Sequence, residues 1–182
     1  MVNIYKLKLT NLQQEILRLF FVKAGISLNA RGVARALEVS QPAVSKALPL
    51  LEEENLITVD KDKESKRLSI KSNRDNPKVI WLKRADNLKH IYESGLVQFF
   101  YDNLPAATII LFGSYAFGED TINSDIDIAV IGANYKDIDL TKFNKTLERV
   151  IIINYFKSFK AIDKHLLNNI LNGIVIKGSV EI

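Results

Sequence analysis

Apolar residues recur every three or four positions in three successive stretches of the first 55 residues, which predicts three amphipathic helices. The stretches run from about residue 11 to the glycine at 25, from 30 to 38, and from 41 to 54. Each is preceded by a short polar residue that can accept a hydrogen bond from the first helical turn. These expected caps are Thr10 or Asn11 for the first helix, Asn29 for the second and Ser40 for the third.

After residue 55 the apolar period changes from helical spacing to alternation. Residues 56–59 and 67–71 read as two strands, and the charged stretch 60–66 reads as the turn between them. Three helices followed by a two-stranded hairpin is the order of a winged helix, which we expect over residues 1–75. One feature disagrees with this pattern: Pro49 lies inside the third helix, and the missing N–H predicts a kinked or shortened helix.

Residues 72–77 have the composition of a linker, and a long helix is predicted from 78 to 103. This linker helix carries an apolar seam from Trp81 to Phe99 with steps of four and three residues. Such a seam either pairs two copies of the chain as a coiled coil or packs on the next domain, and the sequence leaves both readings open.

The remainder, residues 104–182, alternates strands and helices. Continuous apolar runs at 108–112 and 150–156 are typical of buried strands, and 125–131 forms another. Helices are expected at 140–149 and 161–171, followed by a short strand at 174–176. The fold class is therefore α+β: a winged helix, a linker helix at 76–103, and an α/β domain with a small mixed sheet.

Charge is distributed unevenly along the chain. The net charge is +4, with 13 Lys/Arg against 9 Asp/Glu in residues 1–75 and 12 of each in the rest. A basic N-terminal part suits a polyanion partner, although it also serves solubility alone. The chain has no cysteine, which excludes disulfides and thiolate metal sites. Without a secretory signal or an apolar run long enough for a membrane helix, we expect a cytoplasmic protein with no membrane partner.

The third predicted helix has the features of a DNA-reading helix. Its outer face near the N-terminus presents Gln41, Ser45 and Lys46, which suit base edges and phosphates in the major groove. The turn between the two strands adds four basic residues, namely Lys61, Lys63, Lys66 and Arg67. The segment 37–57 resembles the winged-helix cores of MarR-like and ArsR-like regulators. That resemblance implies double-stranded DNA as a partner and a homodimer, while some winged helices instead contact proteins.

A second constellation lies in the C-terminal domain. Gly113 permits a sharp turn from strand to helix, and Ser114 places a hydroxyl and an N–H at the start of that helix, which favours an anion. Asp125 and Asp127 stand two apart on a strand, so both carboxylates lie on one face. Two carboxylates beside a phosphate cradle predict a magnesium site.

The run from Gly113 to Gly118, followed by Ser124-Asp125-Ile126-Asp127, resembles the signature of polymerase β-like nucleotidyltransferases, especially their minimal members. The resemblance implies that Asp125 and Asp127 hold Mg²⁺ or Mn²⁺ and act in catalysis. It further implies that Gly113, Ser114, Gly118 and Ser124 bind a nucleoside triphosphate. The reaction implied is attack of a hydroxyl on the α-phosphorus, with release of pyrophosphate.

Two positions depart from that family pattern. Relatives usually carry a third carboxylate on the next strand, where the strand pattern places Asn154 here, and an amide cannot act as a base. Phe117 stands where relatives often carry Arg or Lys.

Two functions remain open on these residues. One is a DNA-binding transcriptional regulator whose second domain binds Mg-nucleotide without turnover. The other is an active enzyme that transfers a nucleoside monophosphate to a protein or small-molecule hydroxyl. Minimal relatives of the second kind pair with small helical proteins in toxin–antitoxin modules, so an antitoxin-like role with a helical partner protein is included.

Overall fold

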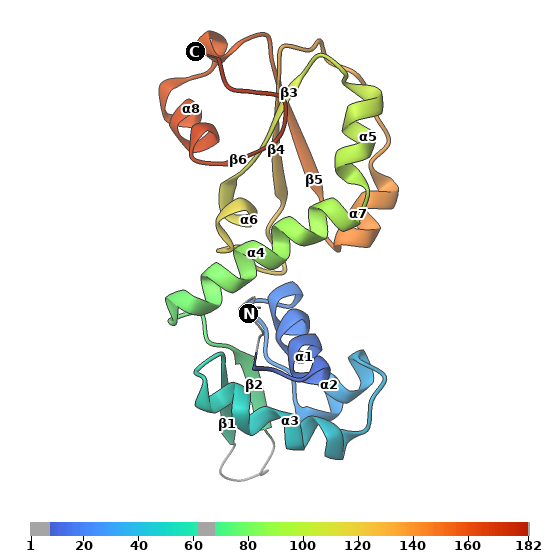
Figure 1. The fold of residues 1–182 in the computed structure, drawn as a ribbon, viewed down its shortest axis with the longest axis vertical. Helices are drawn as coiled ribbons and strands as arrows, with labels where there is room; N and C mark the ends of the chain where they lie inside the picture. Colours follow the sequence, from blue (N-terminus) through green and yellow to red (C-terminus); the bar gives the residue numbers. More distant parts are fainter. Residues whose placement is uncertain (1–7, 62–67, 182) are drawn as a thin grey trace, which may run out of the picture. The chain divides into compact units, whose positions relative to one another are not determined.

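The computed structural model describes residues 8–61 and 68–181, which form two compact units, Met1–Val79 and Ile80–Ile182. The boundary falls inside one helix, α4 (Pro77–Glu93), so the two units are covalently joined by continuous helical backbone. Figure 1 shows the elements of each unit.

The first unit has the predicted winged-helix order. It consists of α1 (Asn11–Val22), α2 (Ala30–Ala36) and α3 (Gln41–Glu53), followed by the antiparallel hairpin of β1 (Ile57–Lys61) and β2 (Leu68–Ser72). All three predicted caps are confirmed, because the side chains of Thr10, Asn29 and Ser40 each accept a backbone N–H of the helix that follows.

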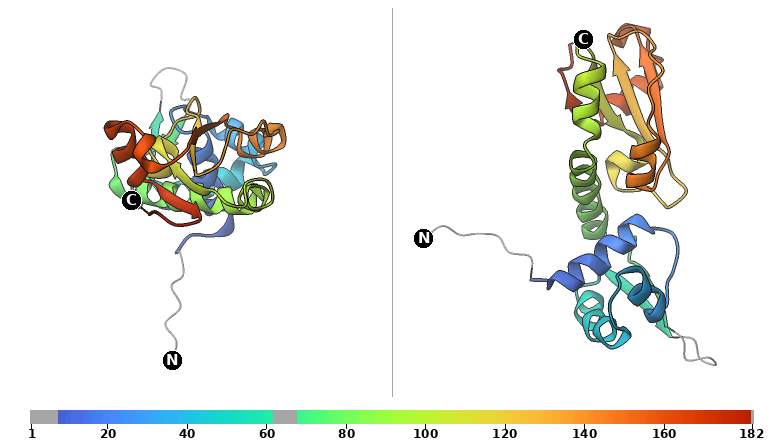
Figure 2. Two further views of the ribbon diagram at one scale, coloured as in Figure 1. Left: turned by 90° about the horizontal axis from the view of Figure 1, so that it is seen from above. Right: turned by 90° about the vertical axis from the view of Figure 1, so that its right-hand side faces the viewer.

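Apolar side chains from all of these elements fill the core of the first unit. Ile16 and Phe20 of α1, Val33 of α2, and Val44 and Leu51 of α3 are all fully buried. Gln13 is the buried polar side chain on α1, and its Nε2 donates to the carbonyl of Ala47 at 3.2 Å, which ties α1 to α3. The views in Figure 2 show the three helices packed beside the hairpin.

The expectation that Pro49 shortens the third helix is wrong. The helix continues through Pro49 and ends at Glu53, as far as the sequence pattern without proline would predict. Pro49 is exposed, so its ring meets solvent and the buried face of α3 packs undisturbed. The local loss of one hydrogen bond is offset by the apolar stripe of Val44, Leu48 and Leu51.

The predicted single helix over residues 78–103 is wrong. Two helices, α4 and α5 (Leu96–Asn103), are separated at Gly95, whose φ of 79° is the left-handed conformation that interrupts a helix. Ile91, Leu96 and Phe100 are fully buried in the core of the second unit. The predicted seam is divided accordingly: Leu88 and Phe99 pack against that core, whereas Trp81 is 68% exposed.

The second unit contains a four-stranded mixed sheet in the order β5-β4-β3-β6. Its strands are β3 (Thr108–Phe112), β4 (Ile126–Ile131), β5 (Ile151–Phe156) and β6 (Ile174–Lys177). The β4–β5 pair is parallel, and β3 is antiparallel to both β4 and β6. The remaining helical elements are α6 (Gly113–Phe117), α7 (Thr141–Leu147), the 3-10 turn η1 (Phe159–Ala161) and α8 (Lys164–Leu171).

Helices cover both faces of this sheet, which explains the continuous apolar runs in the sequence. On one face, alternate residues of β3, β4 and β5 pack with Phe100 of α5 and with Phe143 and Leu147 of α7. On the other face, Ile110, Ala129 and their neighbours pack with η1 and with Ile170 of α8. Figure 1 shows α8 on one side of the strands and α5 with α7 on the other. Among the described residues, no helix is both long and apolar enough to span a membrane.

Candidate functional site: a carboxylate pair beside the strand-to-helix turn

The turn between β3 and α6 lies directly against β4, the strand that carries Asp127. Phe112, the last residue of β3, is the antiparallel partner of Asp127 on β4. Gly113 follows with a φ of 73°, a conformation that glycine adopts without strain. A Cβ at Gly113 would collide with Oδ2 of Asp127. The backbone angle therefore favours glycine here, and any other residue would also displace the Asp127 carboxylate.

Asp125 lies in the loop immediately before β4, and Asp127 is the second residue of that strand. Asp127 is partly buried and Asp125 is exposed. Burial, and then the neighbouring charge of Asp125, raise the pKa of Asp127 above its ordinary value of 3.8. Both causes disfavour the ionised form of Asp127, and a bound cation would stabilise that form.

Three further predicted residues lie on the segments that flank this pair. Ser114 is in the first turn of α6, and its carbonyl accepts the N–H of Glu119 at 2.9 Å. Gly118 ends α6 with a φ of 76°, and a Cβ there would meet the backbone of α4 at the Ile80 carbonyl and at Arg84 N. The Ser124 hydroxyl accepts the N–H of Thr121 at 2.9 Å, which closes the loop immediately before Asp125.

The sheet register shows which residue of β5 is level with Asp127. In the parallel β4–β5 pair, Asp127 is level with Ile152, whereas Asn154 is level with Ala129. Asn154 therefore lies two residues, or about 7 Å, further along the sheet. The residue beside the carboxylate pair is Ile152, which is 39% exposed. Within residues 8–61 and 68–181, no group of three or more acidic, histidine or cysteine side chains is arranged to hold a metal.

Sequence reasoning does not reveal a buried ionic cluster next to the site. Asp120, in the loop between α6 and β4, is fully buried and forms ion pairs with Lys83 of α4 and with Arg149 before β5. Asn87 of α4 donates to both the Asp120 carboxylate, at 2.8 Å, and the Tyr115 carbonyl, at 2.9 Å. No local pattern marks these residues, because they are 29 to 37 positions apart in the sequence.

A cavity of about 390 Å³ lies beside Asp125, between its loop and the segment that joins α7 to β5. Ser124 and Asp125 form one side, and Asn144, Glu148 and Arg149 form the other. The side-chain oxygen Oδ1 of Asn144 accepts the N–H of Ile151 at 3.0 Å, so the side-chain N–H₂ of Asn144 is oriented by the start of β5. The cavity thus offers amide and charged groups next to the carboxylate pair.

Phe117, at the end of α6, has a cation beside it. The guanidinium of Arg84 lies 5.8 Å from the centre of the Phe117 ring, within cation–π distance. Arg84 is exposed, and its backbone packs against Gly118. A positive charge is therefore present next to α6 even though position 117 itself is apolar.

In the first unit, α3 presents its predicted polar residues to solvent. Gln41, Ser45 and Lys46 are exposed, and Val44 and Leu48 of the same helix are buried. Lys61 is exposed at the end of β1. The other three predicted wing residues, Lys63, Lys66 and Arg67, lie outside the described residues.

Comparisons with known proteins agree with the second constellation. Residues 95–181 match the family model described as "Polymerase beta, Nucleotidyltransferase", so the second unit has the nucleotidyltransferase fold. No curated protein matches the chain.

Solved structures similar to this chain include three bacterial proteins. A single-residue mutant of Lactococcus lactis ZitR is 22% identical over 57% of this chain and 67% of that chain, with a TM-score of 0.42. The S. aureus MepR–DNA complex is 22% identical over 52% and 81%, with a TM-score of 0.38. AdcR from Streptococcus pyogenes is 26% identical over 53% and 71%, with a TM-score of 0.37.

Proposed function

We propose that this chain, whose residues 95–181 form a nucleotidyltransferase-fold domain, is a DNA-binding transcriptional regulator that binds a nucleoside triphosphate with Mg²⁺ or Mn²⁺ and does not transfer it. One observation carries the nucleotide half of this proposal: the Asp127 carboxylate packs against Gly113 at the strand-to-helix turn, and the charge of Asp125, just before β4, acts on it.

The residues present fit a divalent cation. In the described part of the chain, neither the Asp125 nor the Asp127 carboxylate forms a hydrogen bond or an ion pair, and burial together with the charge of Asp125 raises the pKa of Asp127. Magnesium takes one or two protein carboxylates and completes its coordination with water and phosphate oxygens. When bound, such an ion neutralises the charge of a triphosphate. Gly113 and Ser114 would contact the phosphates at the turn, and Gly118 and Ser124 would hold the flanking segments.

We propose that no nucleotide is transferred because Ile152, and not a carboxylate, is the residue of β5 beside Asp127. In the family that the motif resembles, a third carboxylate helps to deprotonate the attacking hydroxyl. Here the neighbouring position on β5 carries an apolar side chain that can neither bind metal nor accept a proton. We therefore expect the site to bind nucleotide and leave it intact.

Installing the carboxylate tests this explanation. Ile152→Asp is tolerable because the side chain is 39% exposed, and it should produce metal-dependent pyrophosphate release that the wild type lacks. Asn154→Asp is the matched control, since it adds the same carboxylate beside Ala129 instead of Asp127. Release by Asn154→Asp alone would mean that the register argument is wrong.

The alternative is an active transferase, and the cavity beside Asp125 favours it. Its 390 Å³, with amide and charged groups facing Asp125, could receive the hydroxyl-bearing segment of a small molecule or of a helical partner protein. Metal-dependent labelling of a protein or small molecule by the wild type, from an α-labelled nucleoside triphosphate, would establish this function instead.

Loss of the carboxylate pair tests nucleotide binding directly. The double change Asp125→Asn and Asp127→Asn should abolish Mg²⁺-dependent binding of nucleoside triphosphate in calorimetric titrations with each of the four nucleotides. The matched control is Asp137→Asn with Asp139→Asn, which removes two exposed carboxylates at the same spacing. If Mg²⁺-dependent nucleotide binding survives the change of Asp125 and Asp127 to Asn, these two residues do not bind the metal–nucleotide complex.

The DNA half of the proposal rests on the exposed face of α3. Gln41, Ser45 and Lys46 project from the N-terminal half of a helix whose opposite face is buried, which is the arrangement of a helix that enters the major groove. Glutamine suits adenine edges, and lysine suits guanine or phosphate. Lys61, with Lys63, Lys66 and Arg67, would add phosphate contacts from the wing.

Salt dependence of binding to a pooled random-sequence duplex tests this interface. Lys46→Ala should weaken binding and lower the slope of log K against log salt by about 1, the value for one lost phosphate contact. Lys89→Ala removes the same charge from an exposed position of the second unit and should leave the slope unchanged. A wild-type affinity that hardly varies with salt would contradict phosphate contact.

A homodimer is proposed from the exposed side of α4. Trp81, Ala85 and Tyr92 lie along that helix and are exposed. A second copy of the chain would cover this aromatic stripe. Sedimentation equilibrium of the wild type and of Trp81→Ala tests it, because a monomeric wild type would rule the dimer out.

A further inference from the structure

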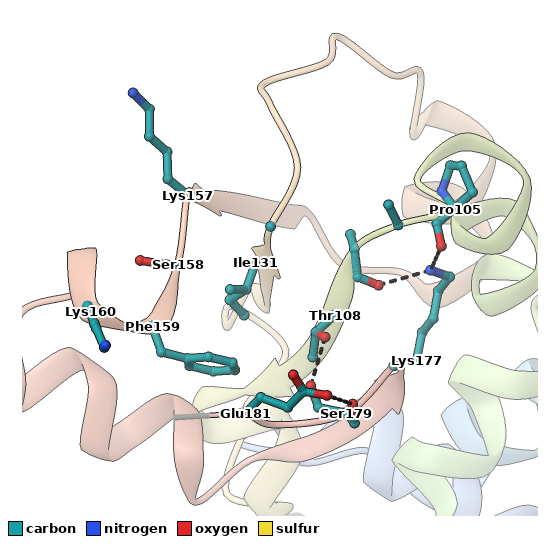
Figure 3. Close-up of a pocket in the computed structure, with 14 residues that line it drawn as sticks. Pro105, Thr108, Ile131, Lys157, Ser158, Phe159, Lys160, Lys177, Ser179 and Glu181 are labelled. Carbon is teal, nitrogen blue, oxygen red and sulfur yellow. Dashed lines mark hydrogen bonds between the residues drawn. The ribbon is translucent and has the colours of Figure 1, made fainter.

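A second cavity, of about 600 Å³, lies at the end of the sheet opposite to Gly113 and Asp127. It is formed where β3 begins, at Thr108, and where β4, β5 and β6 end, at Ile131, Phe156 and Lys177. Its volume is in the range of pockets that hold small organic ligands. Figure 3 shows the residues that line it.

The bottom of this pocket is apolar. Ile131 and Phe159 are both buried and belong to the hydrophobic cluster beneath α8. Ala106 and Ala107 add small side chains from the segment before β3. An aromatic or branched apolar group would therefore meet carbon atoms at the bottom of the pocket.

One wall of the pocket is held in place by a buried lysine. Lys177 Nζ donates to the carbonyls of Leu104, Pro105 and Ala107 at 2.8, 2.8 and 2.9 Å, which uses all three of its N–H bonds. Burial lowers the pKa of Lys177. A lysine placed in this way fixes the turn between α5 and β3, and the wall is formed before any ligand arrives.

The opposite segment is tied to the start of β3. The Thr108 hydroxyl donates to the Ser179 carbonyl at 2.8 Å. Gly178 packs so closely on Thr108 that a Cβ there would lie 2.7 Å from its Oγ1. Both the Lys177 and the Thr108 contacts are visible as dashed lines in Figure 3.

The rim of the pocket carries positive charge. Lys157 and Lys160 line the side away from Lys177, and in Figure 3 the Lys157 side chain extends outward from the pocket. Both lysines are exposed, and neither forms an ion pair or hydrogen bond with the described residues. One carboxylate, that of Glu181, also lines the pocket, between Phe159 and Ser179 (Figure 3), and it accepts a hydrogen bond from the Ser179 hydroxyl at 3.5 Å.

We infer that this pocket binds a small organic anion: an aromatic or branched apolar body seated on Ile131 and Phe159, with a carboxylate or similar group at the rim that carries the exposed Lys157 and Lys160. The site is separate from the nucleotide site and does not depend on it, because it lies at the other end of the strands. The apolar bottom selects against inorganic anions, and the lysine rim selects against neutral molecules of the same shape.

Three probes distinguish these contributions. The probe ligand is 2-naphthoate; 2-naphthamide keeps the apolar body without the charge, and inorganic phosphate keeps charge without the body. Binding to the full chain is followed by calorimetric titration. Saturable 1:1 binding of naphthoate, at least about tenfold tighter than of either comparison compound, is expected. Equal binding of naphthamide or of phosphate, or no saturation by naphthoate up to about 10 mM, overturns the inference.

Two variants locate the binding. Lys157→Ala with Lys160→Ala should weaken naphthoate binding about tenfold, and Lys142→Ala with Lys145→Ala, which removes the same charge from α7, should not. Ala106→Trp adds volume at an exposed lining position and should block binding without changing charge. Unchanged affinity in both rim and blocking variants would place the ligand elsewhere. Asp125→Asn with Asp127→Asn should bind naphthoate normally, and a loss there would assign the ligand to the nucleotide site.

Discussion

The two units differ in what their cores are made of. The first unit buries two polar side chains, Gln13 and Ser72, within its described residues, and its candidate DNA contacts there are all exposed. The second unit buries five polar or charged side chains, several of which are next to its candidate site: Lys83, Asn87, Asp120, Arg149 and Lys177. In the first unit, the residues that stabilise the core are therefore different from the candidate DNA contacts. In the second unit, several buried charged side chains that stabilise the core lie next to the candidate site.

The cause of this difference is electrostatic. A charge removed from water is costly unless a partner of opposite sign replaces the lost hydration. In the second unit Asp120 supplies that partner for Lys83 and Arg149, five residues before Asp125. A change in this cluster should therefore alter both folding and the geometry of the site, whereas a change on α3 should alter binding alone.

The largest effect should come from Asp120→Ala. It leaves Lys83 and Arg149 buried without the carboxylate, which we expect to lower the free energy of unfolding by about 3–5 kcal/mol. Urea denaturation of the full chain, followed by a probe in the second unit, measures it. Asp102→Ala, at an exposed position of α5, should change the same quantity by less than about 0.5 kcal/mol. If Asp120→Ala lowers the free energy of unfolding as little as Asp102→Ala does, the buried ion pairs of Asp120 do not stabilise the protein.

Gly113→Ala should follow in size. Both the φ of 73° and the collision with Asp127 oppose an added Cβ. We expect a loss of about 1–3 kcal/mol in stability, together with loss of metal-dependent nucleotide binding. Gly95→Ala separates the two causes, because Gly95 has a φ of 79° and no atom within 4 Å of its Cβ position. If Gly95→Ala and Gly113→Ala lower the stability equally, backbone strain alone explains the loss at Gly113, and the contact with Asp127 adds nothing to it.

A smaller effect of opposite sign is expected for Asp127→Asn in the absence of metal. Because burial and Asp125 raise the folded-state pKa of Asp127 above 3.8, ionisation opposes folding. The wild type should lose stability as pH rises through this raised pKa, and below 3.8 the opposition should vanish. The Asn variant should therefore melt at a higher temperature than the wild type at pH 7 in EDTA, with the gap closing at low pH. A difference in melting temperature that grows as the pH falls would contradict a raised pKa for Asp127.

The smallest effect on stability should be that of Lys46→Ala. Its side chain is exposed on α3 and makes no contact with the core, so the free energy of unfolding should change by less than about 0.5 kcal/mol. DNA affinity should fall at the same time. A large loss of stability in Lys46→Ala would show that a candidate DNA contact also stabilises the fold of the first unit.

The elements of the fold follow from local patterns. The caps at Thr10, Asn29 and Ser40 and the apolar run of β3 each depend on neighbours in sequence. The break at Gly95 does not follow in this way, because an isolated glycine in a periodic stretch is compatible with a helix. Burial of Leu96 and Phe100 on the sheet decides the outcome.

The candidate site could be predicted only in part, for the same reason. Gly113 and Asp127 stand in one contiguous motif, and the structure brings them together. The identity of the residue beside Asp127 depends on the register of two parallel strands, which the sequence does not encode locally, so the strand pattern places Asn154 where Ile152 lies. Asp120 and its partners escape sequence reasoning because charges 29 to 37 residues apart meet only after folding.

The central claim is that the second unit holds a metal-bound nucleoside triphosphate intact. The most direct measurement is to incubate the full chain with α-labelled nucleoside triphosphates and Mg²⁺ or Mn²⁺, separate protein from free nucleotide, and identify the label that stays with the protein. Intact triphosphate that EDTA releases, retained by the wild type and lost with Asp125→Asn and Asp127→Asn, is the predicted result. Pyrophosphate release, label fixed covalently to an acceptor, or no retention at all would contradict it.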